Sequence, residues 1–523
     1  MTHETQPAFN VLDEPWIPVR LPGGEVRDVS LSQALLEANR ITALAETSPP
    51  NLIALYRLLL AGLHRALSTH HGPWKDADRA RWYREGLPEA PIRAYLEEWR
   101  ERFWLFHPEH PFMQVAALAD SEKTREKLKP WTQIALERSG ADTPLLFDHS
   151  RDATPEPASY SRALRNLLGY LQFTPGGLVK VFKTSDYAGP LASSAAVMPV
   201  DDTLAKTLTL ILHPHSRYAI TDLPAWEKES TQTASILAAP TLPSGDNDRY
   251  TRLTRSVLFA LSDQPGFVTH LHFSEGIALD EDNKDPMICA RVVDGEARRV
   301  SFSEGRSLWR DLPSMVPDTS GKFDIQASCL TQATELRTRM GDDTEKLSVI
   351  AGGWKNAPNK AAKVIRWRLD QIQLPQRLLE DPDCATTLRS FIRKTESFFF
   401  DLKGAGIDMI AAAMPNPAHK ETKKRARAIL DNGPTAAVFY SGAERALADL
   451  MQQIAEGDIE AAQQHWMQAL KTAALRAWSA TSRVLGDSPT ALRAEARAFP
   501  RFQRLLHSLD QPDTETTAEE ANT

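Results

Sequence analysis

Apolar residues recur every three or four positions in three stretches of the N-terminal half. This spacing predicts helices over residues 51–67, 90–106 and 161–173. We expect the second helix to end in the aromatic run Phe103–Phe106. The third should stop at residues 174–177 (TPGG), because proline cannot continue a helix and glycine favours its C-terminal end. The apolar faces of the first and third helices consist of Leu52, Leu55, Leu59, Leu63 and Leu67, and of Leu164, Leu167, Leu168 and Leu171.

The region from about residue 205 to 315 has a different pattern, in which short apolar runs alternate with turns. Four runs are typical of strands: residues 208–214, 268–273, 288–293 and 298–302. The opening segment, residues 9–19, contains two prolines and is expected to be extended, at a sheet edge or an entry. Helices and strands in succession predict a mixed α/β region.

After about residue 385 the pattern becomes helical throughout. Amphipathic spacing predicts long helices over residues 387–400, 435–456, 459–483 and 488–509, which together indicate a four-helix bundle. The fold class expected is therefore α+β. A large mixed α/β domain would span residues 1–384 and the bundle residues 385–510. Residues 511–523 are acidic and almost without apolar side chains, which predicts a disordered tail.

Composition excludes several classes of protein. The net charge is −7, so this is not a chain that coats nucleic acid non-specifically, and contacts with phosphates must come from local patches. No apolar run is long enough to span a membrane, and the N-terminus does not resemble a signal peptide. The cysteines, Cys289, Cys329 and Cys384, lie far apart, which predicts neither a zinc site nor a disulfide framework and fits a cytoplasmic protein.

Catalytic motifs were sought and none was found: the sequence has no phosphate-binding GxxxxGK[ST] loop, no HExxH and no GxSxG. His213 with His215, and His270 with His272, are spaced to lie on one side of a strand. A third metal ligand is lacking nearby, so we expect polar strand faces without a metal. Residues 148–150 (DHS) contain the three residue types of a hydrolytic triad, but adjacent residues cannot adopt the geometry in which each side chain orients the next. We therefore expect no catalysis and no cofactor, although an enzyme with an unrecognised site and a scaffold that binds only proteins stay open as alternatives.

One glycine pair is a candidate for contact with nucleic acid. Gly176-Gly177 is followed by Lys180 and Lys183. Glycine lets a backbone approach another surface closely, and the lysines could meet phosphates. The alternative is that the pair is a plain C-cap of the preceding helix.

A second candidate is the basic segment 352–368, which contains Lys355, Asn356, Asn359, Lys360 and Lys363 and has no acidic residue. Its Gly-Gly and Asn-Ala-Pro-Asn runs suggest an exposed turn or hairpin tip that could enter a groove of a duplex. The alternative is a solvated helix face beginning near Asn359.

A third candidate is residues 420–427 (KETKKRAR), a basic run within the helical region that includes Lys423, Lys424 and Arg425. Such a run could follow the backbone of a duplex. A solvated helix face explains it as well.

Four short motifs then indicate a family. They are Leu12–Val19 (LDEPWIPV), His107–Gln114 (HPEHPFMQ), Gly352–Asn356 (GGWKN) and Asp401–Gly406 (DLKGAG). In this order and spacing, over about 400 residues, they resemble the large subunit of the type I-E CRISPR Cascade complex, the CasA family.

The resemblance implies a mixed α/β domain followed by a four-helix bundle, without catalysis. Some members of the family carry a cluster of cysteines in the middle region, and because this chain lacks that cluster we expect no metal. It implies a subunit that reads the motif flanking a target in double-stranded DNA, wedges the strands apart and recruits a separate helicase–nuclease. The implied partners are the CRISPR RNA and the backbone, small and handle-binding subunits of the complex, with no membrane. Protein reads the flank and base pairing reads the target, as in other RNA-guided systems.

Family positions carry over onto named residues. The loop against the handle of the guide RNA matches Phe147, Asp148, His149 and Ser150. The loop that approaches the minor groove matches Gly176-Gly177, with Lys284 as the nearest candidate for the groove-reading lysine. The wedge falls on Asn356, Asn359 and Lys360. The glutamine of the family's Asn-Gln pair is missing at this tip, so the motif read here is expected to differ or to be looser. The remaining contacts, with the DNA backbone, are expected from Lys180, Lys183, Lys355, Lys363, Lys423, Lys424 and Arg425.

Overall fold

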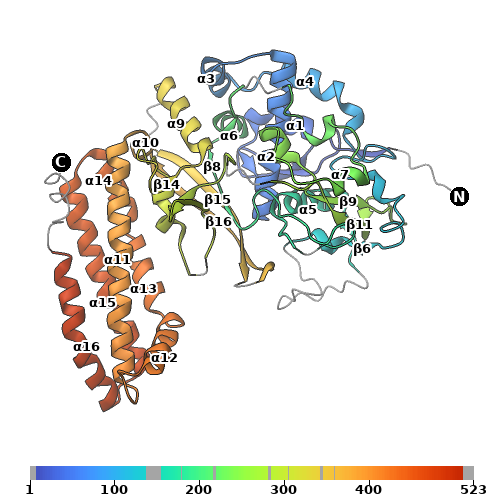
Figure 1. The fold of residues 1–523 in the computed structure, drawn as a ribbon. Helices are drawn as coiled ribbons and strands as arrows, with labels where there is room; N and C mark the ends of the chain where they lie inside the picture. Colours follow the sequence, from blue (N-terminus) through green and yellow to red (C-terminus); the bar gives the residue numbers. More distant parts are fainter. Residues whose placement is uncertain are drawn as a thin grey trace. The chain divides into compact units, whose positions relative to one another are not determined.

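The computed structural model describes residues 7–136, 155–177, 179–215, 220–280, 284–303, 305–341, 346–357 and 360–510. For residues 355–357 and 360–366 it describes the backbone alone. The chain forms two compact units (Figure 1). The first comprises residues 1–304 and 320–373, and the second residues 305–319 and 374–523. The expected domain boundary at residue 384 stays a prediction, and the predicted tail lies outside the described residues.

A central helix organises the first unit. Helix α2 (Pro49–Ala66) is buried along its whole length and packs against α5 (Tyr160–Phe173), α8 (Asp246–Thr251) and α4 (Glu89–Glu98). The helices predicted over residues 51–67 and 161–173 are therefore confirmed, and α5 ends at Phe173, directly before the TPGG stop. The other helices of this unit are α1 (Leu31–Leu36), α3 (Asp76–Glu85), α6 (Leu204–Ile211), α7 (Thr233–Leu237) and α9 (Ser328–Met340).

The described residues of this unit also form six small sheets. The largest has the order β16-β15-β8 and consists of the hairpin β15 (Lys346–Ala357) and β16 (Lys360–Pro375), with β8 (Ala195–Val200) beside β15. A second joins β6 (Lys129–Pro130), β11 (His270–Glu275) and β9 (Arg255–Phe259), and a third joins β13 (Glu296–Arg299), β12 (Ala290–Val293) and β14 (Asp324–Ile325). The others pair β3 (Val26–Val29), β2 (Ile17–Arg20) and β4 (Ala43–Leu44), β1 (Ala8–Asn10) with β5 (Trp104–Phe106), and β10 (Phe267–Val268) with β7 (Ala158–Ser159).

The predictions for residues 103–106 and 208–214 were wrong. The aromatic run at residues 103–106 is not the end of a helix, because residues 104–106 form strand β5 and pair with β1. Residues 208–214 do not form a strand, because α6 occupies the segment up to Ile211. This helix starts at Thr203, whose hydroxyl accepts the backbone N–H of Lys206, and most of its residues are buried. A buried helix has apolar residues on several faces, which makes it indistinguishable from a buried strand by periodicity.

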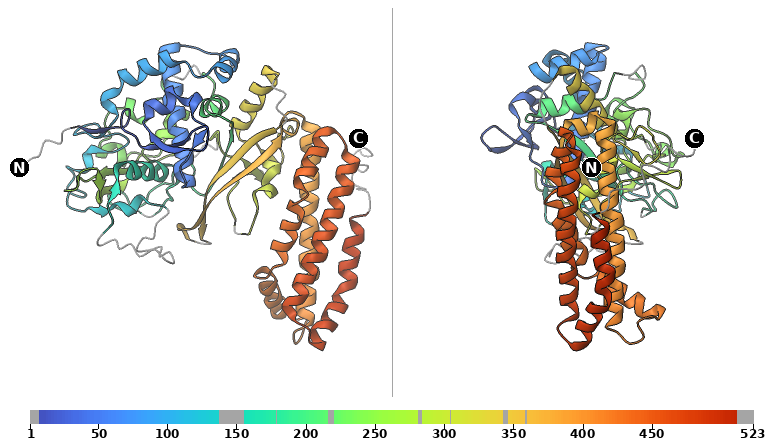
Figure 2. Two further views of the ribbon diagram at one scale, coloured as in Figure 1. Left: turned by 180° about the vertical axis from the view of Figure 1, so that it is seen from behind. Right: turned by 90° about the vertical axis from the view of Figure 1, so that its left-hand side faces the viewer.

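The second unit is helical. Its helices are α10 (Gln376–Glu380), α11 (Pro382–Ala412), α12 (Lys420–Asp431), α13 (Thr435–Glu444), α14 (Leu447–Glu456), α15 (Ile459–Leu485) and α16 (Pro489–Ser508). Helices α11, α15 and α16 run side by side (Figure 2), and α13 and α14 pack on α15. The segment predicted as one helix over 435–456 is thus two helices. The mixed α and β fold class with a helical C-terminal region is confirmed.

The state of the cysteines and the lengths of the apolar helices can also be compared with the expectations from composition. The three cysteines are buried thiols. In the described part of the chain, no helix is both long enough and apolar enough to cross a membrane.

Candidate nucleic-acid interface

The glycine loop, residues 174–189, follows the end of α5, and its described residues, 174–177 and 179–189, form neither a helix nor a strand. Its two sides hydrogen-bond to each other: Gly177 N–H donates to the carbonyl of Asp186 (3.2 Å) and Gly189 N–H to that of Thr174 (2.8 Å). Gly177 is exposed and has φ of +87°, which L side chains rarely adopt. At Gly176 a Cβ would lie 3.1 Å from the backbone nitrogen of Ala188, so a larger residue would press on the opposite side of the loop by a few tenths of an ångström. Glycine thus suits both the positive φ at Gly177 and the close approach of the two sides at Gly176.

The hairpin β15–β16 settles the alternatives for the second basic segment. Residues 360–375 form a strand, so the solvated-helix alternative is wrong and the hairpin is confirmed. The expectation that Gly352-Gly353 forms an exposed turn was also wrong, because both glycines are buried within β15. A Cβ on Gly353 would lie 2.4 Å from the carbonyl oxygen of Ser194, so glycine is required here by close strand packing rather than by a turn.

Trp354 anchors this hairpin in the core. Its side chain is 1% exposed, and its ring meets that of Phe173, the last residue of α5, edge-on at 6.3 Å between centroids. The next residue but one, Asn356, lies near the end of β15, and Lys360 opens β16. Asn359 lies outside the described residues, as do the side chains of Lys355, Asn356, Lys360 and Lys363.

Lys284 is exposed at the start of a segment that packs against the same strands. The next residue, Asp285, is buried and forms an ion pair with the buried Arg57 of α2. Two residues on, the carbonyl of Met287 accepts the N–H of Val197 in β8 at 2.7 Å. Lys284 is thus carried by backbone that is fixed to α2 and β8.

Three elements of the predicted interface therefore meet at one place in the first unit. The glycine loop begins after Phe173, which contacts Trp354, and leads into Ala195 of β8, which pairs with Gly353. The Lys284 segment bonds to β8. Sequence reasoning named the glycine pair, the lysine and the tip separately, and it missed the shared anchor at Gly353-Trp354. The contacts that join them connect residues about 90 to 180 positions apart, which single-sequence periodicity does not report.

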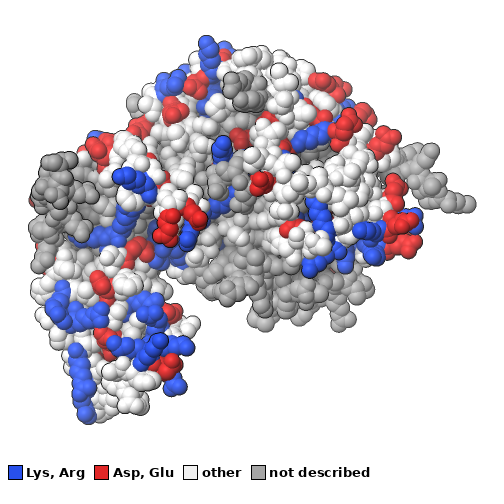
Figure 3. All heavy atoms as spheres, in the orientation of Figure 1, with Lys and Arg blue, Asp and Glu red and all other residues white. Residues whose placement is uncertain are grey.

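The basic run at residues 420–427 lies on α12 in the second unit. Ala426 and Leu430 are buried against Ile407 and Ile410 of α11, while Lys423, Lys424 and Arg425 are exposed. None of these three cations forms an ion pair with a carboxylate among the residues that the structure describes. Figure 3 shows Lys and Arg side chains gathered over this end of the helical unit. Lys423, Lys424 and Arg425 therefore lie on an exposed face of α12.

The predicted guide-handle residues, Phe147, Asp148, His149 and Ser150, lie outside the described residues. Lys180 is exposed on the glycine loop and Lys183 is partly buried, with its ammonium donating to the carbonyl of Ala238 at 3.0 Å.

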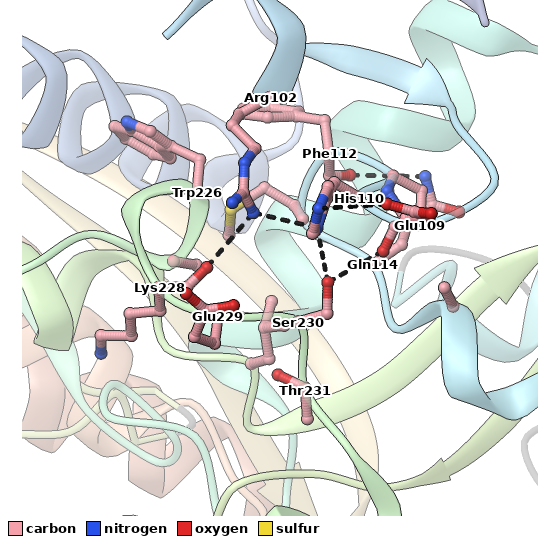
Figure 4. A pocket seen from close by; sticks show the side chains of 15 residues that line it. Arg102, Glu109, His110, Phe112, Gln114, Trp226, Lys228, Glu229, Ser230 and Thr231 are labelled. Carbon is pink, nitrogen blue, oxygen red and sulfur yellow. Dashed lines mark hydrogen bonds and ion pairs between the residues drawn. The ribbon is translucent and has the colours of Figure 1, made fainter.

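The His107–Gln114 motif lines a pocket of about 40 Å³ in the first unit (Figure 4). Ligand sites commonly measure about 300 Å³ or more, so this pocket is too small for a nucleotide. The motif is structural: His107 Nδ1 accepts the N–H of His110 at 2.9 Å, and the Gln114 side chain bonds the carbonyl of Leu105 and the N–H of Phe259.

In the same pocket Ser230 lies beside His110, a pairing that was not predicted from the sequence. Ser230 Oγ lies 2.5 Å from His110 Nδ1, and Arg102 Nη1 lies 2.9 Å from the same nitrogen. Burial, the Arg102 guanidinium and His107 lower the pKa of His110. A weakly basic ring that already accepts from a guanidinium is poorly suited to activate a hydroxyl.

The histidine pairs also differ from expectation. His213 and His215 follow α6 rather than sharing a strand, and His213 stacks on His64 at 3.7 Å between ring centroids. Burial lowers the pKa of His213 to about 4, which keeps the ring neutral near pH 7. His270 and His272 do lie on β11, where His272 Nδ1 contacts the carbonyl of Thr124 at 3.0 Å. Over the described ranges, no three His, Cys, Asp or Glu side chains gather as a metal site would require.

Both a protein-family match and a curated relative assign this chain to a protein family. Residues 10–477 match the family described as CRISPR-associated protein Cse1. The curated CRISPR-associated protein CasA/Cse1 of Thermus thermophilus is 33% identical over 517 residues, which cover 96% of this chain and 98% of that protein. The chain therefore belongs to the CasA/Cse1 family, as its motifs indicated.

Solved structures agree with this membership. A crystal structure of Thermus thermophilus CasA has a TM-score of 0.82 at 30% identity and covers 96% of this chain and 99% of its own. Thermobifida fusca Cse1 has a TM-score of 0.77 at 20% identity, with 97% and 98% coverage, and a chain of a CRISPR RNA-guided surveillance complex has 0.72 at 19%, with 97% and 100%. The last two likenesses show the fold.

Proposed function

We propose that this chain is the non-catalytic large subunit of an RNA-guided antiviral surveillance complex. In this role it recognises the flanking motif in double-stranded DNA, helps to split the strands for R-loop formation and recruits a separate helicase–nuclease. Its partners are the CRISPR RNA and the backbone, small and handle-binding subunits. Membership of the CasA/Cse1 family and the fold shared with a chain of a surveillance complex support the assembly.

The observation that carries flank recognition is the meeting of three elements on β8 and β15. The three elements are the glycine loop with the exposed Gly177, the segment that carries the exposed Lys284, and the hairpin β15–β16. All three are anchored on the buried residues of β8 and β15. The glycine offers backbone to a groove, the lysine meets phosphate or a base edge, and the hairpin enters between strands. With a net charge of −7, such local contacts leave most phosphate neutralisation to the partners.

The remaining assignments follow from the same proposal. Lys180, Lys183, Lys355 and Lys363 follow the DNA backbone beside the glycine loop and the hairpin. Phe147, Asp148, His149 and Ser150 contact the handle of the guide RNA. Lys284, Gly176-Gly177, Asn356, Asn359 and Lys360 face the flank.

The test of the function is to assemble the complex with and without this chain. The complex that lacks it should still pair with a single-stranded target, because base pairing reads the target. It should fail to bind the same target as a duplex, because nothing then reads the flank or opens the strands. Equal duplex binding by both assemblies would contradict the proposal.

Helix α12 offers a separate prediction. Replacing Lys423, Lys424 and Arg425 by glutamine should weaken duplex binding at low salt. The slope of log K against log[salt] should become shallower by about 0.9 for each phosphate that the variant no longer neutralises. Binding is measured across a salt series with the assembled complex.

Arg445→Gln with Arg476→Gln is the matched control, since these exposed cations lie on or beside other helices of the same unit. An unchanged salt slope in the α12 variant would show that its cations are only a solvated face.

A further inference from the structure

Two buried charges lie opposite each other at the end of a small sheet. Arg255 opens β9 and Glu275 closes β11, and they are direct partners in the antiparallel register. Each is 1% exposed. Buried charges cost free energy unless their hydrogen bonds are made, so the partners of this pair indicate what it holds.

Arg255 holds both sides of the glycine loop. Its Nη2 donates to the carbonyl of Pro175 at 2.6 Å, directly before Gly176, and lies 2.6 Å from a carboxylate oxygen of Asp186. Its Nη1 donates to the carbonyl of Tyr187 at 2.7 Å. One guanidinium thus bridges the ascending and the descending flank, which its planar fork of donors allows.

Glu275 holds the part of the loop that follows the glycines. Its carboxylate accepts the backbone N–H groups of Val181 (2.7 Å), Phe182 (3.0 Å) and Lys183 (3.0 Å). Three successive amides converge on one side chain in a segment that has no helix or strand to satisfy them. Bonds to a charged acceptor are stronger than neutral ones, so this carboxylate fixes the local backbone.

The two strand ends pack closely beside this pair. Beside the pair, at Gly276, a Cβ would lie 2.2 Å from the carbonyl oxygen of Leu253, so the two strand ends already approach as closely as glycine allows. What the charges add is a fixed path for residues 175–187, which carry the exposed Gly177 and Lys180 and the lysine at position 183. A loop ordered beforehand loses less conformational entropy when it meets a ligand.

We propose that Arg255 and Glu275 are positioning residues for flank recognition: they hold the glycine loop in the shape that meets the duplex without touching DNA themselves. This inference rests on the proposed function of the loop. Sequence patterns did not single out either residue, although a charge at the end of an apolar strand run, as in RSVLF and HLHFSE, is the signal that could have done so.

The test uses Glu275→Gln and Arg255→Lys in the full chain, assembled into the complex. Glutamine keeps the size of Glu275 but presents an NH₂ group to backbone N–H donors. Lysine keeps the charge of Arg255 but cannot bridge both flanks. Arg65→Lys is the matched control, because Arg65 forms a buried bidentate pair with Glu227 in the same unit.

Two readouts separate positioning from general stability. Hydrogen exchange of the amides of residues 181–183 should rise about tenfold or more in Glu275→Gln, since a charged hydrogen-bond acceptor is lost. The preference of the complex for its own flank over a scrambled flank should fall about tenfold in both variants, with the target sequence unchanged. In Arg65→Lys both quantities should stay at the wild-type value.

Unchanged exchange at residues 181–183, or looser amides with an undiminished flank preference, would overturn the inference. An equal loss of preference in Arg65→Lys would also overturn it, because the effect would then be one of stability. A wild-type complex with no flank preference would instead overturn the proposed function, and that result is seen before any variant is compared.

Discussion

Replacing Asn356, Asn359 and Lys360 together by alanine should abolish binding of the target duplex by the assembled complex and leave its assembly intact. Asn356 lies near the end of β15 and Lys360 opens β16, beyond the buried anchor Trp354, and Asn359 directly precedes Lys360 in the sequence. Amides can hydrogen-bond base edges, and a lysine can follow phosphates. At about 1–3 kcal/mol for each good contact, losing three should weaken binding by at least about a hundredfold.

Duplex binding is measured across a salt series, and assembly by co-purification with the other subunits and the guide RNA. Gln371→Ala is the matched control. It removes a side-chain amide from β16, the strand that Lys360 opens, but at the base of the hairpin, where Gln371 donates to Ser348 Oγ at 2.7 Å. Unchanged binding by the triple variant at every salt concentration would remove the wedge assignment and favour a scaffold that binds only proteins.

The second large effect is expected at the anchor of the hairpin. Trp354→Ala should destabilise the first unit by about 3–5 kcal/mol, the usual cost of removing a buried tryptophan side chain from a core. The indole fills the space between β15 and the end of α5, where it meets Phe173. Because the glycine loop starts after Phe173, duplex binding should also fall at temperatures where the variant is still folded.

Trp354→Phe is the informative comparison. The indole N–H makes no hydrogen bond within the described part of the chain, so most of the contribution of this residue is packing. Phenylalanine should therefore retain most of the stability and most of the duplex binding. Denaturant unfolding of the purified chain gives the free energies. A Trp354→Ala variant as stable as wild type would show that the hairpin is not anchored here.

The sequence predicted helices and strands better than the tertiary contacts between them. Helix α2 was predictable because a leucine face at helical spacing marks it, and the stop after α5 because proline and paired glycines end helices. The strand at residues 104–106 was missed because its partner, β1, lies about 95 residues away and leaves no local trace. Helix α6 was missed because burial on several faces removes the alternation that distinguishes a helix from a strand.

The four family motifs mainly identified structural residues, which lie next to the residues assigned to DNA contact. Trp16, Gln114 and Trp354 are buried, and Gly406 lets Leu430 of α12 approach α11, where a Cβ would lie 2.6 Å from the Leu430 side chain. These four residues come from the four family motifs: Trp16, Trp354 and Gly406 act in packing, and the side chain of Gln114 hydrogen-bonds to the backbone. The residues assigned to the flank lie just outside such positions, on loops and a hairpin end. Which side chains hold them depends on contacts across the fold, as with Arg57 and Asp285 or Arg255 and Pro175.

The central claim is that the glycine loop and the hairpin end read the flank together. The measurement that tests it most directly is a structure of the assembled complex bound to a target duplex. The account predicts Gly177 against the minor groove of the flanking base pairs and Lys360 at the point where the strands separate. A structure in which the duplex opens with neither residue in contact with it would contradict the account.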